Sequence, residues 1–433
     1  MTAPNSSELR IHMSPRFHYG WIVVGVTFVA LMVGAGVRSA PGILITPLEN
    51  EFHWSRATIS FAVSVNLVLY GLMGPFSAAL MERFGLRRTI PIALIVIGTG
   101  VALTSIMHET WQLVLLWGVM VGAGAGAVAN VLAAMIATRW FTARRGFVLG
   151  IMSASVATGQ LVFLPTFASV TTTYGWRATV LLIACVVLLA VPLVALLMRD
   201  RPTDVGLAPY GETGGPKPTP QLAGNPVALA FKALRDAVRV RDFWLLAGTF
   251  FICGASTNGL IGTHLIPACL DYGIPEVTGA GLLAAMGVFN LIGTTGSGWL
   301  SDRFDSRILL SLYYGLRGLS LIYLPFAFFS YSTLSLFTVF YGLDWFATVA
   351  PTVRLITNSF GKEKTGLVYG WIFVTHQIGG ASAAFFGGLL RENFGTYQES
   401  FILSGLLCLL AAVMALLIGR WHRDEAGELK PAI

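Results

Sequence analysis

Five ionisable side chains lie inside long apolar stretches of the sequence, and these are the residues that could do chemistry there: Arg38, His264, Arg317, Asp344 and His376. A charge near the centre of a bilayer costs at least about 2.5 to 3.5 kcal/mol on insertion scales, so such a group is a functional candidate. A guanidinium can hold a carboxylate through two hydrogen bonds. A carboxyl or an imidazole can carry a proton. The pattern indicates passage of a small molecule or ion through a membrane.

The guanidinium of Arg38 falls roughly 25 Å along the first apolar stretch, at 1.5 Å per helical residue, and therefore in its outer half. We interpret Arg38 as the anchor for a substrate carboxylate. Two other interpretations are open at this stage. The side chain could reach the outer headgroups, or it could pair with Glu51.

Asp344 is the carboxylate that lies deep in an apolar stretch, and Arg317 lies near the middle of the stretch before it. Asp344 could carry protons for coupled transport. It could equally form a buried ion pair with Arg317 that holds two neighbouring helices together. The sequence leaves both interpretations open.

Histidines and uncharged polar residues could complete a site. His376, next to Gln377, lies in a stretch rich in small residues and could line a cavity or take part in proton coupling with Asp344, and His264 lies toward an outer end. Each histidine could instead have a structural role. The predicted substrate-binding set is Arg38, Asn130, Gln160, His264, Asn290 and His376, and Asn66 and Asn258 are further polar candidates.

The elements that must position these residues are membrane-spanning helices. The chain has 433 residues, of which 55% are apolar and 11% charged, against about 25% charged in soluble domains, and its mean hydropathy is +0.72. A helix needs about 20 residues to cross a bilayer. The sequence predicts an all-α membrane protein with twelve spans: Tyr19–Ile45, Ala57–Leu80, Thr89–Met107, Trp111–Thr138, Gly146–Val170, Trp176–Leu197, Phe243–Cys269, Val277–Leu300, Ile308–Phe329, Ser332–Thr357, Leu367–Leu390 and Phe401–Gly419.

Charge distribution predicts the orientation. Of the 28 Lys and Arg residues, 23 lie in the two tails and the even-numbered connections, counting Arg354 near the end of the tenth span, and three lie in the odd-numbered ones. By the positive-inside rule both termini are then cytoplasmic. The Pro- and Gly-rich segment 199–241 reads as a cytoplasmic linker between two halves, 1–198 and 242–433. The end of this linker has helical character, and we interpret it as an amphipathic helix on the inner leaflet, or alternatively as a site for a regulatory partner.

Several functional classes are excluded. The net charge of +7 is spread over short loops rather than gathered in one stripe, so we expect no nucleic-acid partner. Cys185, Cys253, Cys269 and Cys408 show no metal or redox spacing, and we expect no metal and no cofactor. The chain lacks a phosphate-binding G-x-x-x-x-G-K-[ST] motif and the H-E-x-x-H and G-x-S-x-G motifs, so it should be neither an ATP-driven pump nor an enzyme. The expected partners of a monomer are the lipid bilayer and a small-molecule substrate.

Two charged strings stand 220 positions apart, ERFGLRR at 82–88 and DRFDSR at 302–307. The first resembles the G-x-x-x-D-R-x-G-x-R-R signature of the major facilitator superfamily, with Ala78 and Glu82 in place of its Gly and Asp. The second keeps Gly298 and Asp302. The resemblance implies two pseudo-symmetric six-helix bundles. We interpret the strings as a conformational latch between the halves that involves Glu82, Arg83, Arg87, Asp302 and Arg303.

Two further stretches are similar to the monocarboxylate and oxalate transporter branch of that superfamily: PGILITPLENEFHWSR at 41–56 and WFTARRG at 140–146. Three departures limit the resemblance. The eighth span has no arginine at 288–294, where that branch often binds the substrate carboxylate. Gly118 stands where proton-coupled members often have an arginine, and Pro165 follows Leu164 rather than a glycine.

Together these observations predict a secondary active transporter in the cell inner membrane. It would move a small organic anion, a mono- or dicarboxylate, by alternating access with proton symport. The alternative is a transporter, importer or exporter, of a neutral or aromatic solute such as a vitamin or a drug-like compound. The absent arginine of span eight favours this alternative, as do the span aromatics Tyr70, Trp117, Tyr341, Trp345 and Trp371.

Overall fold

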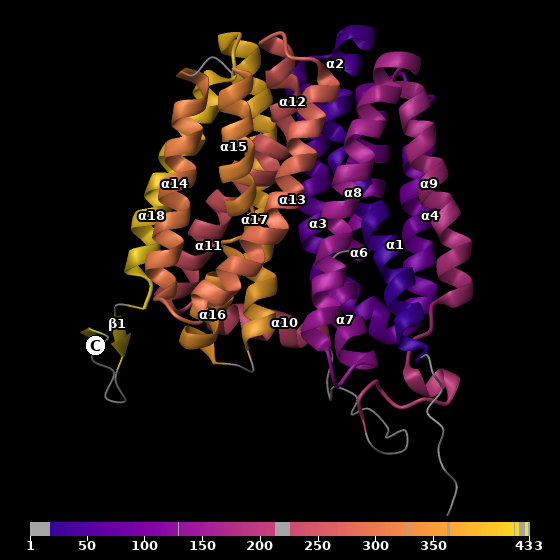
Figure 1. Ribbon diagram of the computed structural model, residues 1–433, viewed down its shortest axis with the longest axis vertical. Coiled ribbons are helices and arrows are strands. Elements are labelled where there is room, and N and C mark those ends of the chain that lie inside the picture. Colours follow the sequence, from indigo (N-terminus) through magenta and orange to yellow (C-terminus); the bar gives the residue numbers. More distant parts are fainter. Residues whose placement is uncertain are drawn as a thin grey trace, which may run out of the picture.

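The computed structural model of the chain describes residues 18–128, 130–212, 226–326, 330–361, 364–419, 421–423 and 429–431. Two groups of long helices stand side by side (Figure 1), one from the residues before the linker and one from those after it. We call the end of the molecule that carries the linker the linker end, and the opposite end the far end. The prediction of an all-α membrane fold is confirmed.

The first half contains α1 (Gly20–Ser39), α2 (Pro41–Phe52), α3 (Arg56–Phe84), α4 (Leu86–Thr104), α5 (Thr110–Leu113), the π-helix η1 (Val114–Val121), α6 (Gly122–Ala127), α7 (Asn130–Trp140), α8 (Arg145–Tyr174) and α9 (Trp176–Leu197). The linker contains the 3₁₀ turn η2 (Pro202–Val205) and α10 (Pro226–Ala237), where the sequence predicts an amphipathic helix. α10 lies against α17, where the indole of Trp371 donates a hydrogen bond of 2.8 Å to the carbonyl of Ala230.

The second half contains α11 (Arg241–Gly254), the π-helix η3 (Ala255–Ile261), α12 (Gly262–Asp271), α13 (Glu276–Ser301), α14 (Ser306–Phe326), α15 (Tyr331–Asp344), α16 (Val349–Phe360), α17 (Thr365–Phe394) and α18 (Gln398–Leu417). Beyond it, β1 (Trp421–Arg423) and β2 (Leu429–Pro431) form a short antiparallel ladder that the sequence does not predict. Trp421 pairs with Pro431 in this ladder.

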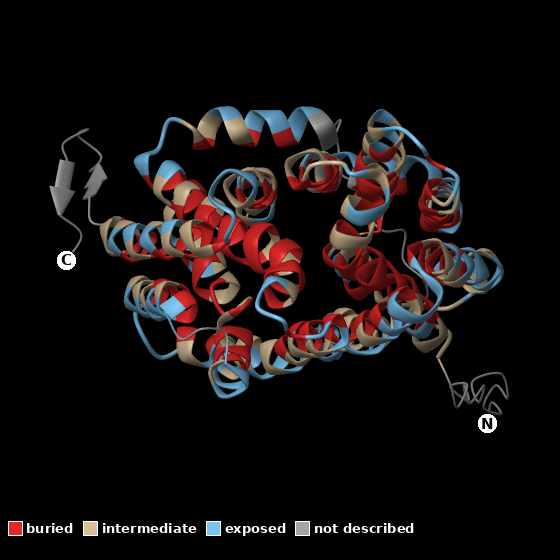
Figure 2. Ribbon diagram, turned by 90° about the horizontal axis from the view of Figure 1, so that it is seen from above, coloured by how far each residue is buried: buried red, intermediate tan, exposed pale blue. Residues whose placement is uncertain are grey.

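The described residues contain the twelve long helical stretches that the sequence predicts. Eleven of them are long and apolar enough to cross a membrane. The twelfth is α17, a helix of 30 residues that is less apolar because it carries polar and small residues. It packs between α3 and α11. Large apolar side chains of the outer helices, such as Leu189 and Leu196 of α9, are exposed on the outer surface, as expected for contact with lipid. Buried residues fill the interior of each half (Figure 2).

Serine hydroxyls begin two of the spans at the far end. Ser55 accepts a hydrogen bond of 3.2 Å from the backbone N–H of Thr58 at the start of α3, and Ser330 accepts one of 3.3 Å from Thr333 at the start of α15. Such caps satisfy a backbone donor that has no partner within the helix. They fix where these spans begin.

Every third span is interrupted. The first breaks at Ala40, because Pro41 has no N–H to donate to the preceding turn. The fourth and seventh contain the π-helices η1 and η3, and the tenth breaks at residues 345–348 between α15 and α16. These four spans occupy corresponding positions in the two halves, which makes their interruptions a shared feature of the fold.

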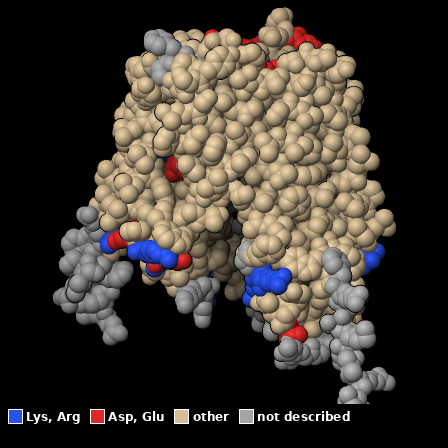
Figure 3. Space-filling model, viewed as in Figure 1, with Lys and Arg blue, Asp and Glu red and all other residues tan. Residues whose placement is uncertain are grey.

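The two halves touch along their far halves and separate toward the linker end. α3 packs against α17, α8 against α13, and α2 against α12. The contacts along α3 run from Arg56 at the far end through Ser64, which donates a 2.7 Å hydrogen bond to the carbonyl of Ala381, to Gly71 beside Gln377. The surface is hollowed between the halves at the linker end (Figure 3). The conformation is therefore closed at the far end and open at the linker end.

Replacing Gly379 by Ala should destabilise the second half, because the new Cβ would press against the backbone carbonyl of Phe251 in α11. Overpacking of this kind costs about 1–3 kcal/mol. The thermal unfolding midpoint of the purified protein in detergent measures the effect. Gly370→Ala is the matched control on the same helix, because its Cβ would have no neighbour within 4 Å. An equal midpoint for the two variants would contradict this account of the α11–α17 contact.

Candidate functional site

Interrupted helices at corresponding positions of two structural repeats indicate where a binding site of such a membrane protein lies. Arg38 is the second-last residue of α1, beside the first interruption. Its Nη1 donates a hydrogen bond of 3.1 Å to the hydroxyl of Tyr70 on α3, and its guanidinium carbon lies 5.0 Å from the centroid of that ring. The ion pairs that the described residues form do not include Arg38. Its guanidinium contacts a phenol and a π face, and no carboxylate among the described residues balances its charge.

The predicted alternative that Arg38 pairs with Glu51 is wrong. The carboxylate of Glu51 lies 2.5 Å from Nη1 of Arg177 and accepts a 2.6 Å hydrogen bond from the indole of Trp176. Both partners come from the start of α9. Glu51 therefore serves the packing of the first half at the far end.

Arg38 lies beside a contact between the two halves. The ring of Tyr70 lies 6.2 Å from that of Phe373 on α17, and its neighbour Gly71 lies against Gln377. Gln377 of α17 also contacts the seventh span. Its side-chain oxygen lies 3.4 Å from the amide nitrogen of Asn258. The guanidinium therefore lies beside the contact between α3 of the first half and α17 of the second.

The structure places His376 behind aromatic rings rather than on an open surface. Its side chain is buried, with the rings of Phe373 and Phe250 at 5.7 Å and 4.9 Å. Its Nδ1 is buried and has no hydrogen-bond partner among the described residues. The predicted lining role of His376 is thus corrected for this conformation, because Phe373 covers it.

His264 is also corrected. It is fully buried, its Nε2 lies 2.8 Å from the carbonyl oxygen of Ala384, and its Nδ1 lies 3.2 Å from the hydroxyl of Tyr397. Both ring nitrogens are used within the second half, so the ring offers nothing to a substrate. His264 has the structural role that the sequence left open.

Asn290 uses its side-chain oxygen for hydrogen bonds within the protein. Its side-chain oxygen accepts hydrogen bonds from the N–H of Phe346, at 3.1 Å, and from the hydroxyl of Thr294, at 3.0 Å. Phe346 lies in the interruption of the tenth span, where the backbone has lost its helical partners. Asn66 does the same for η1, with a 2.7 Å hydrogen bond to the carbonyl of Trp117. The oxygen of Asn290 is therefore already occupied.

Gln160 and Asn130 are the remaining members of the predicted set. The side-chain oxygen of Gln160 on α8 lies against Gly287 of α13, so this glutamine sits at the second seam between the halves. Asn130 begins α7, the last helix of the fourth span, and its side chain lies outside the described residues. The structure therefore places Gln160 at the interface between the halves.

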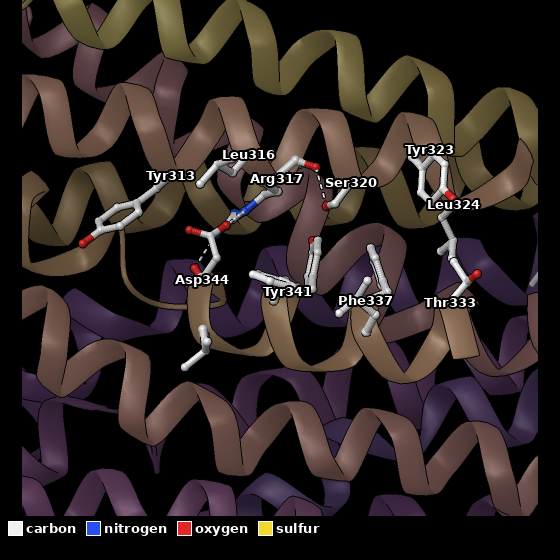
Figure 4. A pocket seen from close by; sticks show the side chains of 13 residues that line it. Tyr313, Leu316, Arg317, Ser320, Tyr323, Leu324, Thr333, Phe337, Tyr341 and Asp344 are labelled. Atoms are coloured by element: carbon white, nitrogen blue, oxygen red, sulfur yellow. Dashed lines mark hydrogen bonds and ion pairs between the residues drawn. The ribbon is translucent and has the colours of Figure 1, made fainter. Parts of the chain in front are cut away.

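Arg317 and Asp344 form the ion pair that the sequence left open, with Nε and Oδ2 2.5 Å apart (Figure 4). The same guanidinium donates to the backbone carbonyl of Asp344 at 2.7 Å and to that of Trp345 at 3.3 Å. It also lies 3.3 Å from the hydroxyl of Ser256 and 3.2 Å from the sulfur of Cys253. Arg317 therefore joins the seventh, ninth and tenth spans where two of them are irregular.

The far end is closed by a cluster of charges that we call the far-end cluster: Glu49, Arg56, Asp271, Arg391 and Tyr397. Arg56 of the first half is 8% exposed, and its two terminal nitrogens each lie 3.1 Å from a carboxylate oxygen of Asp271 in the second half. Its Nε donates to Glu49 at 2.7 Å. Asp271 also accepts a 2.6 Å hydrogen bond from Arg391. The bidentate pair of Arg56 and Asp271 ties the two halves together.

Tyr397 completes the far-end cluster with a neutral hydroxyl. Burial raises its pKa to about 12, although the guanidinium of Arg56 acts in the opposite direction. Its oxygen lies 3.3 Å from Nη1 of Arg56 and 3.2 Å from Nδ1 of His264. Sequence reasoning counted Arg56 and Arg391 only as charges. The sequence signal for this cluster is that the few charged residues of the odd-numbered connections include both acids and bases.

The latch residues of the first half make contacts within that half. The backbone N–H of Arg87 donates a 2.8 Å hydrogen bond to the carboxylate of Asp200, which follows α9. The guanidinium of Arg83 lies 5.4 Å from the ring of Phe84. The side chain of Glu82 lies outside the described residues.

The latch residues of the second half behave in the same way. Asp302 lies 3.4 Å from Arg354 of α16, which also donates to the carbonyl of Ser301. Arg303 lies over the ring of Trp299 at 3.9 Å. The described latch residues thus form no bond between the halves in this conformation, because the halves are apart at the linker end. Their latch role stays a prediction for a state that is closed there.

Comparison with known proteins gives one family for most of the chain. The family model described as Major Facilitator Superfamily matches residues 26–384. Among solved structures, the chain resembles a bacterial homologue of the human lysosomal transporter Spinster, in an inward-facing and unoccupied conformation, with a TM-score of 0.70. The identity is 16%, and the match covers 92% of this chain and 97% of that one. At this identity the likeness supports the fold alone.

Curated relatives cover nearly the whole chain at low identity. The uncharacterized MFS-type transporter YcxA of Bacillus subtilis is 27% identical over 394 residues, which are 88% of this chain and 90% of that protein. Monocarboxylate transporter 13 of Bos taurus is 25% identical over 95% of this chain and 92% of its own length. Monocarboxylate transporter 2 of Homo sapiens is 22% identical over 96% of this chain and 88% of its own length.

Arg56→Gln should open the far end, because removing one partner of a buried ion pair costs about 3–5 kcal/mol and this pair exists only in the closed arrangement. Spin labels at Asn50 and Glu392, which are exposed at the far end of the two halves, report the separation. We expect longer distances in the variant. Arg177→Gln is the matched control, since its ion pair with Glu51 lies within one half. An unchanged distance distribution in Arg56→Gln would show that the far-end cluster does not hold the halves together.

Proposed function

The chain belongs to the Major Facilitator Superfamily, and we propose that it is a secondary transporter that moves a small organic anion, a mono- or dicarboxylate, by alternating access. The observation that carries this proposal is the position of Arg38. It is a guanidinium beside the contact between α3 and α17 of the two halves, with Tyr70 as its hydrogen-bond partner and no carboxylate partner among the described residues. The printed names of the relatives that are monocarboxylate transporters support the same substrate class.

The physical reason is charge compensation. A guanidinium without a carboxylate partner in a low-dielectric region is costly, and a bound carboxylate would lower that cost through two parallel hydrogen bonds. Tyr70 holds the side chain by hydrogen bond and cation–π contact without neutralising it. Arg38 is thereby oriented and still available to an anion. Gln160, at the second seam, could donate to the same anion.

We place the linker end in the cytoplasm and the protein in the cell inner membrane. Support comes from the 23 basic residues in the tails and even-numbered connections, against three in the odd-numbered ones. With that orientation the conformation is inward-facing. The far-end cluster would then be the extracellular closure, and its opening together with closure of the linker end would expose Arg38 to the other side.

Proton symport is the proposed source of energy, with Asp344 and His376 as the groups that change protonation. The two residues lie on either side of Cys253, whose sulfur lies 3.2 Å from Nη1 of Arg317, the partner of Asp344. The ring of His376 lies against Phe250 of the helix that carries Cys253. This arrangement links a buried carboxylate to the aromatic side of the hollow through polar side chains of the second half.

A second candidate is a neutral or aromatic solute. It is favoured by the rings that continue from Arg38 into the second half, the buried Tyr70 and the half-buried Phe373 and Tyr369, with ring separations of 6.2 Å and 6.4 Å. Such rings can stack on an aromatic solute. An aromatic carboxylate would use both features, whereas a neutral solute would not need the charge of Arg38.

Arg38→Gln should abolish uptake of carboxylates by proteoliposomes, because glutamine keeps the hydrogen bond to Tyr70 in kind but removes the charge. Arg38→Lys should retain part of it, since a lysine supplies charge without the bidentate geometry. Uptake of a panel of mono- and dicarboxylates is measured beside the thermal unfolding midpoint, which should stay near that of the wild type. Normal carboxylate uptake in Arg38→Gln would remove the anion proposal, and uptake of a neutral solute that is unchanged in this variant would favour the second candidate.

Proton coupling predicts that a protonophore collapses uphill accumulation of the substrate in vesicles with an imposed proton gradient. Asp344→Asn should lose accumulation but keep exchange of substrate across the membrane, because the amide cannot release a proton. The separation of accumulation from exchange is the measurement. Uphill uptake that survives the protonophore would contradict symport. Full accumulation in Asp344→Asn would show that Asp344 does not carry the coupled proton.

A further inference from the structure

The linker helix α10 is held at the linker end by both halves of the molecule. It packs against α17 of the second half and against α3 of the first. The indole of Trp371 on α17 donates a 2.8 Å hydrogen bond to the carbonyl of Ala230, and the ammonium of Lys364 lies 3.2 Å from the carboxylate of Asp236. The buried residues in the described part of α10 share one helical face: Ala230, Ala233 and Ala237. This alanine face is the one that contacts the spans.

The opposite face of α10 is exposed. Lys232 and Arg235 are three positions apart, so their cations lie on the same side of the helix, and both residues are exposed. The ion pairs and hydrogen bonds that the described residues form include neither of these side chains. Beside them, Leu229 and Phe231 are 36% and 50% exposed. The exposed face therefore combines two unpaired charges with two apolar side chains.

Two tryptophans place α10 at the level of the membrane–water interface. Trp244, near the start of the seventh span, is 60% exposed and donates a 2.9 Å hydrogen bond to the carbonyl of Val238, just after α10. Trp371 donates to the middle of the helix, at Ala230. Tryptophan is enriched where spans meet the headgroups. α10 lies across the direction of the spans (Figure 1), and seen along the spans it lies at the edge of the molecule (Figure 2).

The chemistry of the exposed face selects its partner. A negatively charged membrane surface attracts basic segments that lie near it. Apolar side chains next to such cations can enter the boundary between headgroups and acyl chains, as they do in other interfacial helices. A zwitterionic lipid would accommodate the apolar side chains without balancing Lys232 and Arg235. An acidic soluble protein would balance the cations but would leave Leu229 and Phe231 without a matching surface.

We propose that α10 binds the phosphate headgroups of anionic lipids in the leaflet at the linker end, and that these lipids favour the conformation that is open at this end. The second part follows from the contacts of α10 with α3 and α17, which belong to different halves and are apart at this end. Closure brings these two helices together there and displaces α10, and bound lipids oppose that movement. This part rests on the proposed alternating access, but neither part depends on Arg38 or on the class of substrate.

Lipid binding is tested with two probes, phosphatidylglycerol and phosphatidylcholine with the same acyl chains. Each is titrated into the purified full-length protein in detergent, where a ligand of the folded state raises the thermal unfolding midpoint. We expect phosphatidylglycerol to raise the midpoint more than phosphatidylcholine, and the difference to shrink at high salt because exposed charges are screened. Equal effects of the two lipids on the wild type would overturn the proposal.

A pair of double variants tests the location. Lys232→Gln/Arg235→Gln should lose at least half of the difference between the two lipids. Arg88→Gln/Arg144→Gln is the matched control, because it removes two exposed cations of the linker end that lie outside α10, and it should keep the difference. Equal losses in the two double variants, or a full difference in Lys232→Gln/Arg235→Gln, would overturn the assignment to α10.

The conformational effect is measured with spin labels at Ala143 and Asn358, which are exposed on the two halves at the linker end. In nanodiscs, phosphatidylglycerol should increase the fraction of long distances relative to phosphatidylcholine, and Lys232→Gln/Arg235→Gln should abolish that increase. Two populations whose ratio ignores the lipid would overturn the effect on conformation while leaving alternating access intact. A single population in both lipids would contradict alternating access and this effect together.

Discussion

The fold depends on one constraint, that backbone groups inside a bilayer must find partners within the protein. In four of the spans the regular α-helical hydrogen bonding is interrupted, by a proline, by two π-helices and by a turn. Polar side chains from neighbouring spans supply what is missing. Asn66 donates to a carbonyl of η1, Asn290 accepts from the N–H of Phe346, and Arg317 donates to two carbonyls at the end of α15. The interruptions are therefore stable features that can face a binding site.

These hydrogen bonds distinguish polar residues with a structural role from polar residues that a substrate could contact. Asn290 and His264 have the polarity of binding residues, but their oxygen and nitrogen atoms are occupied by protein partners. Arg38 differs, because the partner it holds is a phenol that leaves its charge uncompensated. Our proposal of an anion as substrate rests on this contrast more than on the presence of an arginine.

Sequence patterns predict the helices well, because length and hydropathy decide which segments can cross a bilayer. The span Trp176–Leu197 agrees with its predicted bounds, and the polar helix α17 is found despite its histidine and glutamine. The partners of individual polar residues were beyond prediction, because they depend on how helices distant in sequence pack. Arg56 and Asp271 are 215 positions apart, and only the closed far end brings them together. The sequence likewise offers both a paired and a free Asp344, and packing decides for the pair.

The far-end cluster is arranged so that separating the halves exposes no bare charge. Arg56 keeps Glu49, which belongs to its own half, and Asp271 keeps Arg391, which belongs to the other. Opening therefore removes the bidentate bond between Arg56 and Asp271 and the contact of Arg56 with Tyr397, and the remaining pairs limit the cost. A transporter whose two states interconvert needs states within a few kcal/mol of each other, so the linker end must gain comparable contacts when it closes. The exposed charges there, Arg83, Asp302 and Arg303, are now held loosely within their own halves, which leaves them available for that exchange.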